Sequence, residues 1–168
     1  RENALRALYS SEDIHAVMQA LEFLNANEQL LPHKKILVDG LLSFDKKEEL
    51  IPLLWKKLSE FHPRMQVNLL DYIRYASSNW KDEMLSMLET SQDREIQIAC
   101  VRYFGRYQDE RSVSFLLHHA KEEKEGVWEL QNACISALAM YPGPQTLEIL
   151  KKEISSKNWY VRHNAAKS

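Results

Sequence analysis

The side chains of this chain that could do metal or acid–base chemistry are its histidines and its paired carboxylates. His118 and His119 are adjacent, and adjacent residues of an α-helix point about 100° apart, so both cannot face one metal ion. The other histidines lack Cys, Asp or Glu partners at the spacing of metal ligands: His15, His33, His62 and His163. We therefore predict no metal site and no bound cofactor.

Pairs of adjacent carboxylates could serve as general acid and base. Three of the pairs have lysine nearby and fall where a solvated helix end belongs: Glu48-Glu49, Asp82-Glu83 and Glu122-Glu123. The sequence also has no glycine-rich phosphate loop, no Gly-x-Ser-x-Gly and no His-Glu-x-x-His. We interpret the pairs as surface charges and predict that the chain is not an enzyme.

Two tryptophans are candidates for binding a partner. Trp128 and Trp159 occupy corresponding places in two similar stretches of sequence, two residues before Leu130 and Val161. A tryptophan that recurs at the start of a helix can stack on a neighbouring turn, or it can form part of a ridge for a partner, because Trp is enriched in binding hot spots. Both interpretations stay open.

These residues belong to an internal repeat. Each copy begins with an aliphatic residue and a long polar one, and a pair of small or aliphatic residues follows. The first member of that pair recurs every 31 to 34 residues: Ala4, Leu37, Leu69, Cys100, Cys134 and Ala165. Such a period is the signature of stacked helical units. Because this place is small and apolar, we predict that Cys100 and Cys134 are buried free thiols without a disulfide.

Each repeat contains two stretches of helical periodicity. The first helices are expected at about 1–9, 28–43, 63–77, 92–106, 126–140 and 158–168. The second helices are expected at about 11–25, 45–60, 79–90, 109–123 and 144–156. Pro63 suits a first helical turn, and Pro142-Gly143-Pro144 predicts a turn between helices. In the last second helix, the spacing of Leu147, Leu150 and Ile154 predicts the buried stripe.

Composition sets the class of protein. The chain has 168 residues, of which 45% are hydrophobic and 27% charged, with a net charge of −2, as in a soluble globular protein. Acidic and basic residues are spread evenly over both halves, so we expect no nucleic-acid partner. No apolar run approaches 18 residues, so no membrane contact is expected from this stretch. We expect a cytoplasmic location.

The repeats predict a single domain over residues 1–168. Its units are expected at about 1–26, 27–61, 62–91, 92–125 and 126–157, with an incomplete one at 158–168. Both ends fall inside a repeat and lack the polar cap of a terminal unit. We therefore expect the chain to be a piece of a longer protein, in which a membrane anchor could lie elsewhere.

The chain resembles HEAT repeats, particularly the short HEAT-like units named after phycobilisome lyases. The pattern of an aspartate and a Val-Arg pair followed by alanines is nearest in residues 160–166, and it is recognisable in 93–105 and 129–139. The arginine of that pattern is kept as Arg162. Other polar residues stand at the corresponding places of earlier repeats: Lys34, Gln66, Gln97 and Gln131. The resemblance implies an all-α, right-handed α-solenoid of about five helix pairs plus one orphan helix.

Such a fold implies a non-catalytic scaffold that binds a partner protein or peptide. In HEAT-like stacks the second helices line the concave face, so their residues opposite the apolar stripe are the expected contact surface: Gln19, Trp55, Lys56, His118 and Lys152. Trp55 could instead be core. The first alternative is a lyase-like HEAT enzyme, or an enzyme-associated module, that binds a ligand in the concavity. The second is a nucleic-acid-binding HEAT-like domain.

Overall fold

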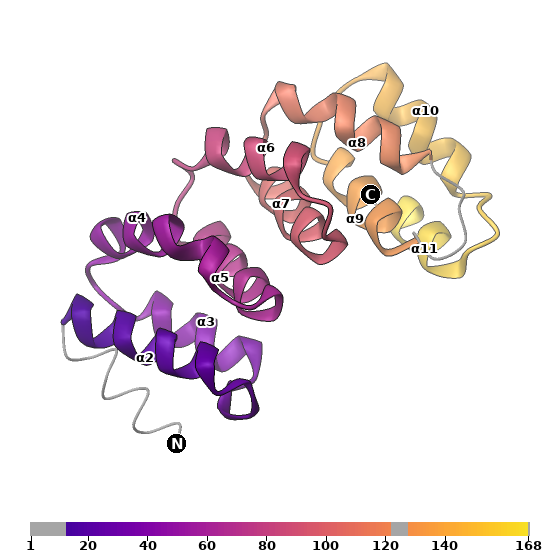
Figure 1. The fold of residues 1–168 in the computed structure, drawn as a ribbon. Coiled ribbons are helices and arrows are strands. Elements are labelled where there is room, and N and C mark those ends of the chain that lie inside the picture. Colours follow the sequence, from indigo (N-terminus) through magenta and orange to yellow (C-terminus); the bar gives the residue numbers. More distant parts are fainter. Residues whose placement is uncertain (1–12, 122–127, 168) are drawn as a thin grey trace. The chain divides into compact units, whose positions relative to one another are not determined.

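The computed structural model describes residues 13–121 and 128–167, and this part of the chain folds into helices joined by short turns, without a β-strand (Figure 1). The all-α prediction is therefore confirmed for these residues. Some predicted features lie outside the described residues, namely the helix at 1–9 with Ala4, the carboxylate pair Glu122-Glu123 and the start of the helix at 126–140. The α-helices are α2 (Ile14–Ala26), α3 (Lys34–Leu42), α4 (Lys47–Lys57), α5 (Pro63–Ala76), α6 (Lys81–Thr90), α7 (Arg94–Arg106), α8 (Val113–Ala120), α9 (Trp128–Leu138), α10 (Pro144–Glu153) and α11 (Trp159–Lys167).

Capping residues and prolines set several of the helix starts. The side chain of Asp13 accepts hydrogen bonds from the backbone N–H groups of the first turn of α2, and Asp93 does the same for α7. Pro63 and Pro144 occupy the first positions of α5 and α10, where a missing N–H costs nothing. The predicted turn at Pro142-Gly143-Pro144 is therefore confirmed.

The helix predicted at 28–43 is wrong as one element, because the chain leaves the helical conformation near Pro32. A 3₁₀ turn (Glu28–Leu30) ends at Leu31, whose ψ of 121° is extended, and α3 begins only at Lys34. A residue that precedes proline is disfavoured in the helical region because the proline ring clashes with its backbone. Pro32 thus divides the predicted helix into two pieces.

The chain forms two compact units, residues 1–77 and 78–168, and each is described by itself. In the first unit α3 packs against α5, while α2 and α4 approach each other. Its core is made of aliphatic and aromatic side chains with no more than 2% exposure, including Val17, Leu21, Leu37, Leu41, Phe44, Leu54, Leu69 and Tyr72. The observed arrangement is one of packed helix pairs.

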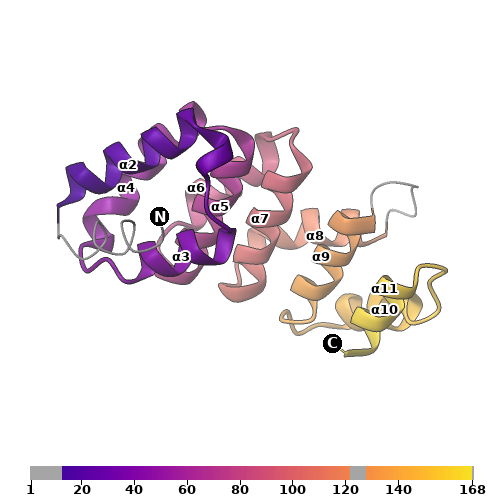
Figure 2. The same ribbon diagram turned by 90° about the horizontal axis from the view of Figure 1, so that it is seen from below.

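In the second unit α9 lies between α7 and α11, and the other helices pack on these three. Among these, α6 packs on α7, α8 packs on α9, and α10 packs on α11 (Figure 2). Each second helix of a repeat is thus close to the first helix of the next. Cys100 and Cys134 are buried free thiols, as predicted, within a core that includes Phe104, Leu116 and Leu138.

The buried stripe predicted for α10 is wrong. Leu147 is 52% exposed and Ile154 is 48% exposed, while Thr146, Ile149 and Glu153 are buried. The buried set has the same spacing as the predicted one but is shifted by one position along the chain. A shift of one position corresponds to a rotation of the helix by about 100°.

A polar contact accompanies this rotation. Nε2 of Gln131 on α9 lies 3.4 Å from Oε2 of Glu153, and both side chains are buried. Charged residues are rarely buried without such a partner, so the contact helps to keep this side of α10 turned inward.

The long polar residue that opens the repeats has one structural role in four of them. Its side chain donates a hydrogen bond to a backbone carbonyl five to eleven residues earlier: Gln66 to Phe61 (2.6 Å), Gln97 to Ser91 (2.9 Å), Gln131 to Ala120 (3.2 Å) and Arg162 to Ser156 (2.7 Å). These carbonyls lie at or just after the end of the preceding second helix, where backbone acceptors lack helical partners. The contact therefore joins one repeat to the next.

Candidate binding surfaces

The predicted contact residues of the first unit lie on two neighbouring helices. Gln19 is exposed on α2, and Lys56 is exposed on α4. Trp55 on α4 is half-buried, so its ring contributes both to packing and to the surface. The structure thus places the three predicted residues of this unit on one pair of adjacent second helices.

In the second unit His118 on α8 and Lys152 on α10 are exposed. The two tryptophans of the repeat differ in environment. Trp128 at the start of α9 is half-buried, whereas Trp159 at the start of α11 is 57% exposed. The Trp159 ring stacks on His163 one turn later, with the ring centroids 5.2 Å apart and the planes 12° from parallel.

Exposed apolar side chains also lie on second helices. Phe23 on α2 is 57% exposed and Leu53 on α4 is 40% exposed. Leu147 on α10 and Ile154, which caps the end of α10, are exposed to a similar degree. Sequence reasoning missed Phe23 and Leu53. The signal was present, because neither residue falls on the apolar stripe of its helix, and a large apolar residue off the stripe points to solvent.

A cavity of about 480 Å³ lies in the first unit between α3 and the last turn of α5. Its lining residues include both charged and apolar side chains, among them His33, Lys34, Lys35, Val38, Arg74 and Tyr75, and most of the lining surface is apolar. Its volume falls within the range of about 300–1,000 Å³ that is typical of ligand pockets. None of the residues predicted from the sequence to bind a partner lines it.

Asp71 positions two of the cations in the wall of this cavity. Its side chain is fully buried, and it forms ion pairs with Lys34 of α3 and with Arg74, whose Nη2 lies 3.0 Å from Oδ1 of Asp71. One carboxylate therefore faces two cations. A buried charge requires such partners, and here the pairing also fixes where the two cationic side chains lie.

The guanidinium of Arg74 is held from a second side by Tyr75. Nη2 of Arg74 donates a hydrogen bond of 2.8 Å to the hydroxyl of Tyr75, and the guanidinium carbon lies 4.4 Å from the Tyr75 ring centroid. The Tyr75 ring is itself 46% exposed. The last turn of α5 thus presents a fixed cation beside an accessible aromatic ring.

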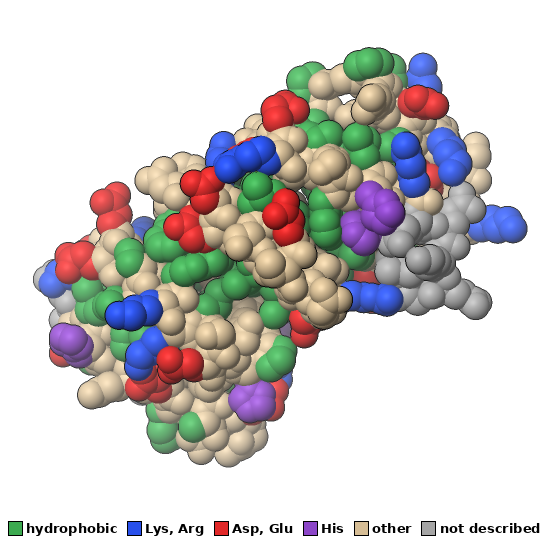
Figure 3. Space-filling view, turned by 45° about the horizontal axis from the view of Figure 1, so that its top comes forward, with side chains coloured by type: hydrophobic (Ala, Val, Ile, Leu, Met, Phe, Trp, Pro, Cys, Tyr) green, Lys and Arg blue, Asp and Glu red, His purple; other side chains and the backbone are tan. Residues whose placement is uncertain are grey.

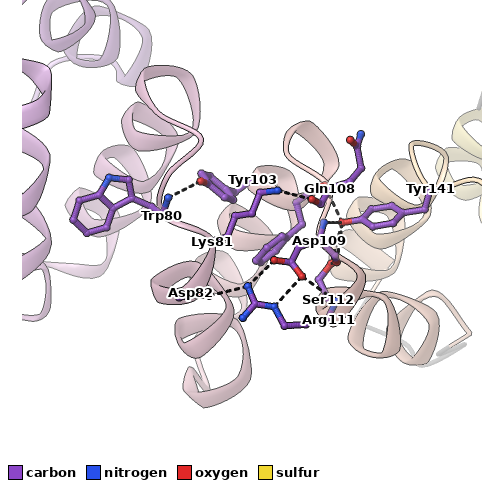
Figure 4. Close-up of polar contacts among 10 residues, drawn as sticks. Trp80, Lys81, Asp82, Tyr103, Gln108, Asp109, Arg111, Ser112 and Tyr141 are labelled. Carbon is purple, nitrogen blue, oxygen red and sulfur yellow. Dashed lines mark hydrogen bonds and ion pairs between the residues drawn. The ribbon is translucent and has the colours of Figure 1, made fainter.

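In the second unit a network of polar side chains ties together the ends of α6 to α9 (Figure 4). Arg111 forms ion pairs with both Asp109 and Asp82, at 2.7 Å each. The hydrogen bond that Arg111 donates to Asp109 holds the pKa of that carboxyl below its usual value. At the α6 side, the N–H of Trp80 donates to the hydroxyl of Tyr103 at 3.0 Å, and burial raises the pKa of Tyr103 to about 12.

The groups considered for catalysis have structural or surface positions. Glu48 and Glu49 are exposed in the first turn of α4, and Asp82 is paired with Arg111. The His118 and His119 rings meet edge to face, with centroids 4.9 Å apart. Across residues 13–121 and 128–167, no three His, Cys, Asp or Glu side chains converge as metal ligands would. In the same ranges no helix has the length and apolarity needed to cross a membrane.

Comparison with known proteins gives no relative: no family model, no curated protein and no solved structure matches this chain. The interpretation of function therefore depends on the chain's own surfaces.

Proposed function

We propose that this chain is a non-catalytic scaffold, a right-handed α-solenoid of HEAT-like helix pairs whose second helices bind a partner protein or an extended peptide. The observation that supports this proposal is the exposure of large apolar side chains on or at the end of second helices of both units: Phe23 on α2, Leu53 on α4, Leu147 on α10 and Ile154 just after it. Burial of one such side chain at an interface stabilises a complex by about 1.5–3 kcal/mol.

Polar residues accompany these apolar side chains on the same helices. Gln19 is on α2, Lys56 is on α4 and Lys152 is on α10, and all three are exposed. Apolar anchors with polar neighbours are the composition of protein interfaces, in which a few buried side chains supply most of the affinity.

The distribution of charge favours a protein partner over a nucleic acid. On the face drawn in Figure 3, basic and acidic side chains are interspersed, and the sequence has a net charge of −2. A surface that binds the phosphate backbone carries a basic stripe, because the affinity comes largely from counterion release.

Partner capture with matched variants tests this proposal. The immobilised chain is compared with two second-helix variants, Lys56→Glu with Lys152→Glu, and Phe23→Ser with Ile154→Ser. The matched control carries Arg64→Glu and Arg102→Glu, which reverse one exposed charge on a first helix of each unit. Retained proteins are identified by mass spectrometry.

We expect the control to retain the same protein as the native chain, and both second-helix variants to lose it. Equal retention by all variants would contradict binding through the second helices. Recovery of a nucleic acid or a coloured ligand in place of a protein would contradict the scaffold itself.

A further inference from the structure

The cavity between α3 and α5 has the chemistry of an anion site with an apolar side. Three cationic side chains line it, Lys34, Lys35 and Arg74, and Asp39 is the acidic residue in its lining. Asp71, which is buried behind Lys34 and Arg74, is the second anion in contact with these cations. Three positive charges against two negative ones leave this group of residues with a net positive charge.

The cations differ in how firmly they are held. Arg74 is 17% exposed at its side chain and is fixed by Asp71 and Tyr75, so it is oriented before any ligand arrives. Lys35 is 77% exposed and pairs with Asp39, which is also largely exposed. An exposed pair of this kind contributes little to stability, so Lys35 can exchange Asp39 for a ligand carboxylate at small cost.

Apolar surface lies next to these charges. Val38 and Leu42 of α3 line the same cavity, and the ring of Tyr75 is 46% exposed. A free inorganic anion would use none of this surface. A peptide that carries carboxylate side chains beside apolar ones would match both the charge and the apolar wall.

We propose that this cavity binds an acidic peptide segment of a partner protein, with a carboxylate at Lys35 and Arg74 and a neighbouring apolar side chain against Val38 and Tyr75. The inference rests on the proposed scaffold function, and it adds a second contact surface on first helices to the one on second helices. It also gives the chemistry of the segment that is recognised.

The test is an NMR titration of the ¹⁵N-labelled chain with a short capped peptide in which paired glutamates are flanked by leucines. The matched peptide has glutamines in place of the glutamates, and free glutarate is a third probe. We expect the acidic peptide to shift the amide signals of residues 33–39 and 74–75. Binding should weaken between about 0.1 M and 1 M salt, over which the Debye length falls from about 10 Å to about 3 Å.

Substitutions of residues that line the cavity should change the affinity for the acidic peptide in opposite directions. Lys35→Glu and Tyr75→Ala alter exposed side chains, and each should weaken binding of the acidic peptide by about fivefold to tenfold. Asp39→Asn removes the competing anion and should tighten binding by about twofold to fivefold, a gain that misfolding cannot produce. Arg64→Glu in the first turn of α5 is the control and should change nothing.

Equal binding of the glutamate and glutamine peptides would overturn the proposal. The proposal would also fail if neither Lys35→Glu nor Asp39→Asn changed the affinity for the acidic peptide. Glutarate that binds as tightly as the peptide would also overturn it, because the site would then recognise a small anion alone. None of these outcomes affects the scaffold proposal, which is tested separately by partner capture with the second-helix variants.

Discussion

The hydroxyl of Tyr141, just after α9, lies 2.9 Å from Oγ of Ser112, and both side chains are buried in the second unit (Figure 4). The same hydroxyl accepts a hydrogen bond from the N–H of Asp109 at 3.1 Å and donates one to the carbonyl of Phe104 at 3.1 Å. One phenol oxygen therefore joins α7, the turn before α8 and the end of α9.

Removal of this hydroxyl is the first prediction. Tyr141→Phe keeps the ring but leaves the buried Ser112 hydroxyl and the Asp109 N–H without this partner, which should lower the free energy of unfolding by about 1–3 kcal/mol. Tyr107, 34 residues earlier in the repeat, is half-buried, and its hydroxyl accepts a hydrogen bond from the partly solvated Arg106. Tyr107→Phe should therefore cost less than about 0.5 kcal/mol. Urea unfolding, monitored by circular dichroism, measures the free energy of unfolding of both variants. Equal losses of stability in the two would contradict the role assigned to Tyr141.

The second prediction concerns the side chain that joins successive repeats. Nε2 of Gln97 donates to the carbonyl of Ser91, and Arg162 makes the corresponding contact to Ser156. Gln97→Arg keeps a donor of similar reach and should leave stability nearly unchanged. Gln97→Glu places a second acceptor against the carbonyl and should lower the free energy of unfolding by about 1 kcal/mol or more. Thermal unfolding distinguishes the two variants, and equal stabilities would show that the contact does not matter.

Local signals predicted most of the helices, because their starts depend on single residues. Pro63 and Pro144 begin α5 and α10, and the burial of Cys100 and Cys134 follows from the period of the repeat. These features need no knowledge of what lies across the fold. Pro32 is a local signal of the same kind. Its effect on the conformation of the preceding residue could have predicted the break in the helix expected at 28–43.

Features that depend on tertiary neighbours could not be predicted in this way. Two stripes of equal spacing lie on α10, and its packing against neighbouring helices decides which of them is buried. The cavity of the first unit depends on Lys34 and Arg74, which are 40 residues apart and meet at the buried Asp71. Periodicity identifies Asp71 only as a helical residue, not as a carboxylate shared by two cations.

The third prediction is a pH dependence that comes from Asp109. The hydrogen bond from Arg111 lowers the pKa of Asp109 in the folded state, so the unfolded chain binds this proton more readily than the native one. The stabilisation is complete above the unfolded pKa, about 3.9, and is lost as the pH falls through the lower folded value. Asp109→Asn keeps an acceptor for the turn but removes the charge. Its urea midpoint should fall less between pH 5 and pH 2 than that of the native chain, and parallel curves would contradict this assignment.

The fourth prediction is that both thiols are protected in the native protein. Cys100 and Cys134 have no exposed surface, and burial raises the pKa of Cys100 to about 12, so the reactive thiolate is scarce at neutral pH. Labelling with an aromatic disulfide reagent at pH 8 should be slow, and it should reach both thiols once urea unfolds the chain. Urea-unfolded protein is the control for reagent activity. Rapid labelling of one thiol in the native state would show that its part of the second unit opens locally.

The fifth prediction tests the close approach of α7 to α9. A Cβ built on Gly105 would lie 3.3 Å from both Cα and Cβ of Ala137, closer than ordinary van der Waals contact. Gly105→Val therefore forces the two helices apart, and we expect it to lower the free energy of unfolding by about 1–3 kcal/mol despite the better helix propensity of valine. Gly143 is the matched control, because a Cβ there meets no atom within 4 Å and its φ of 162° is extended. Gly143→Val should change the urea midpoint little, and if Gly105→Val behaved in the same way, the contact between α7 and α9 would have to be looser than the structure shows.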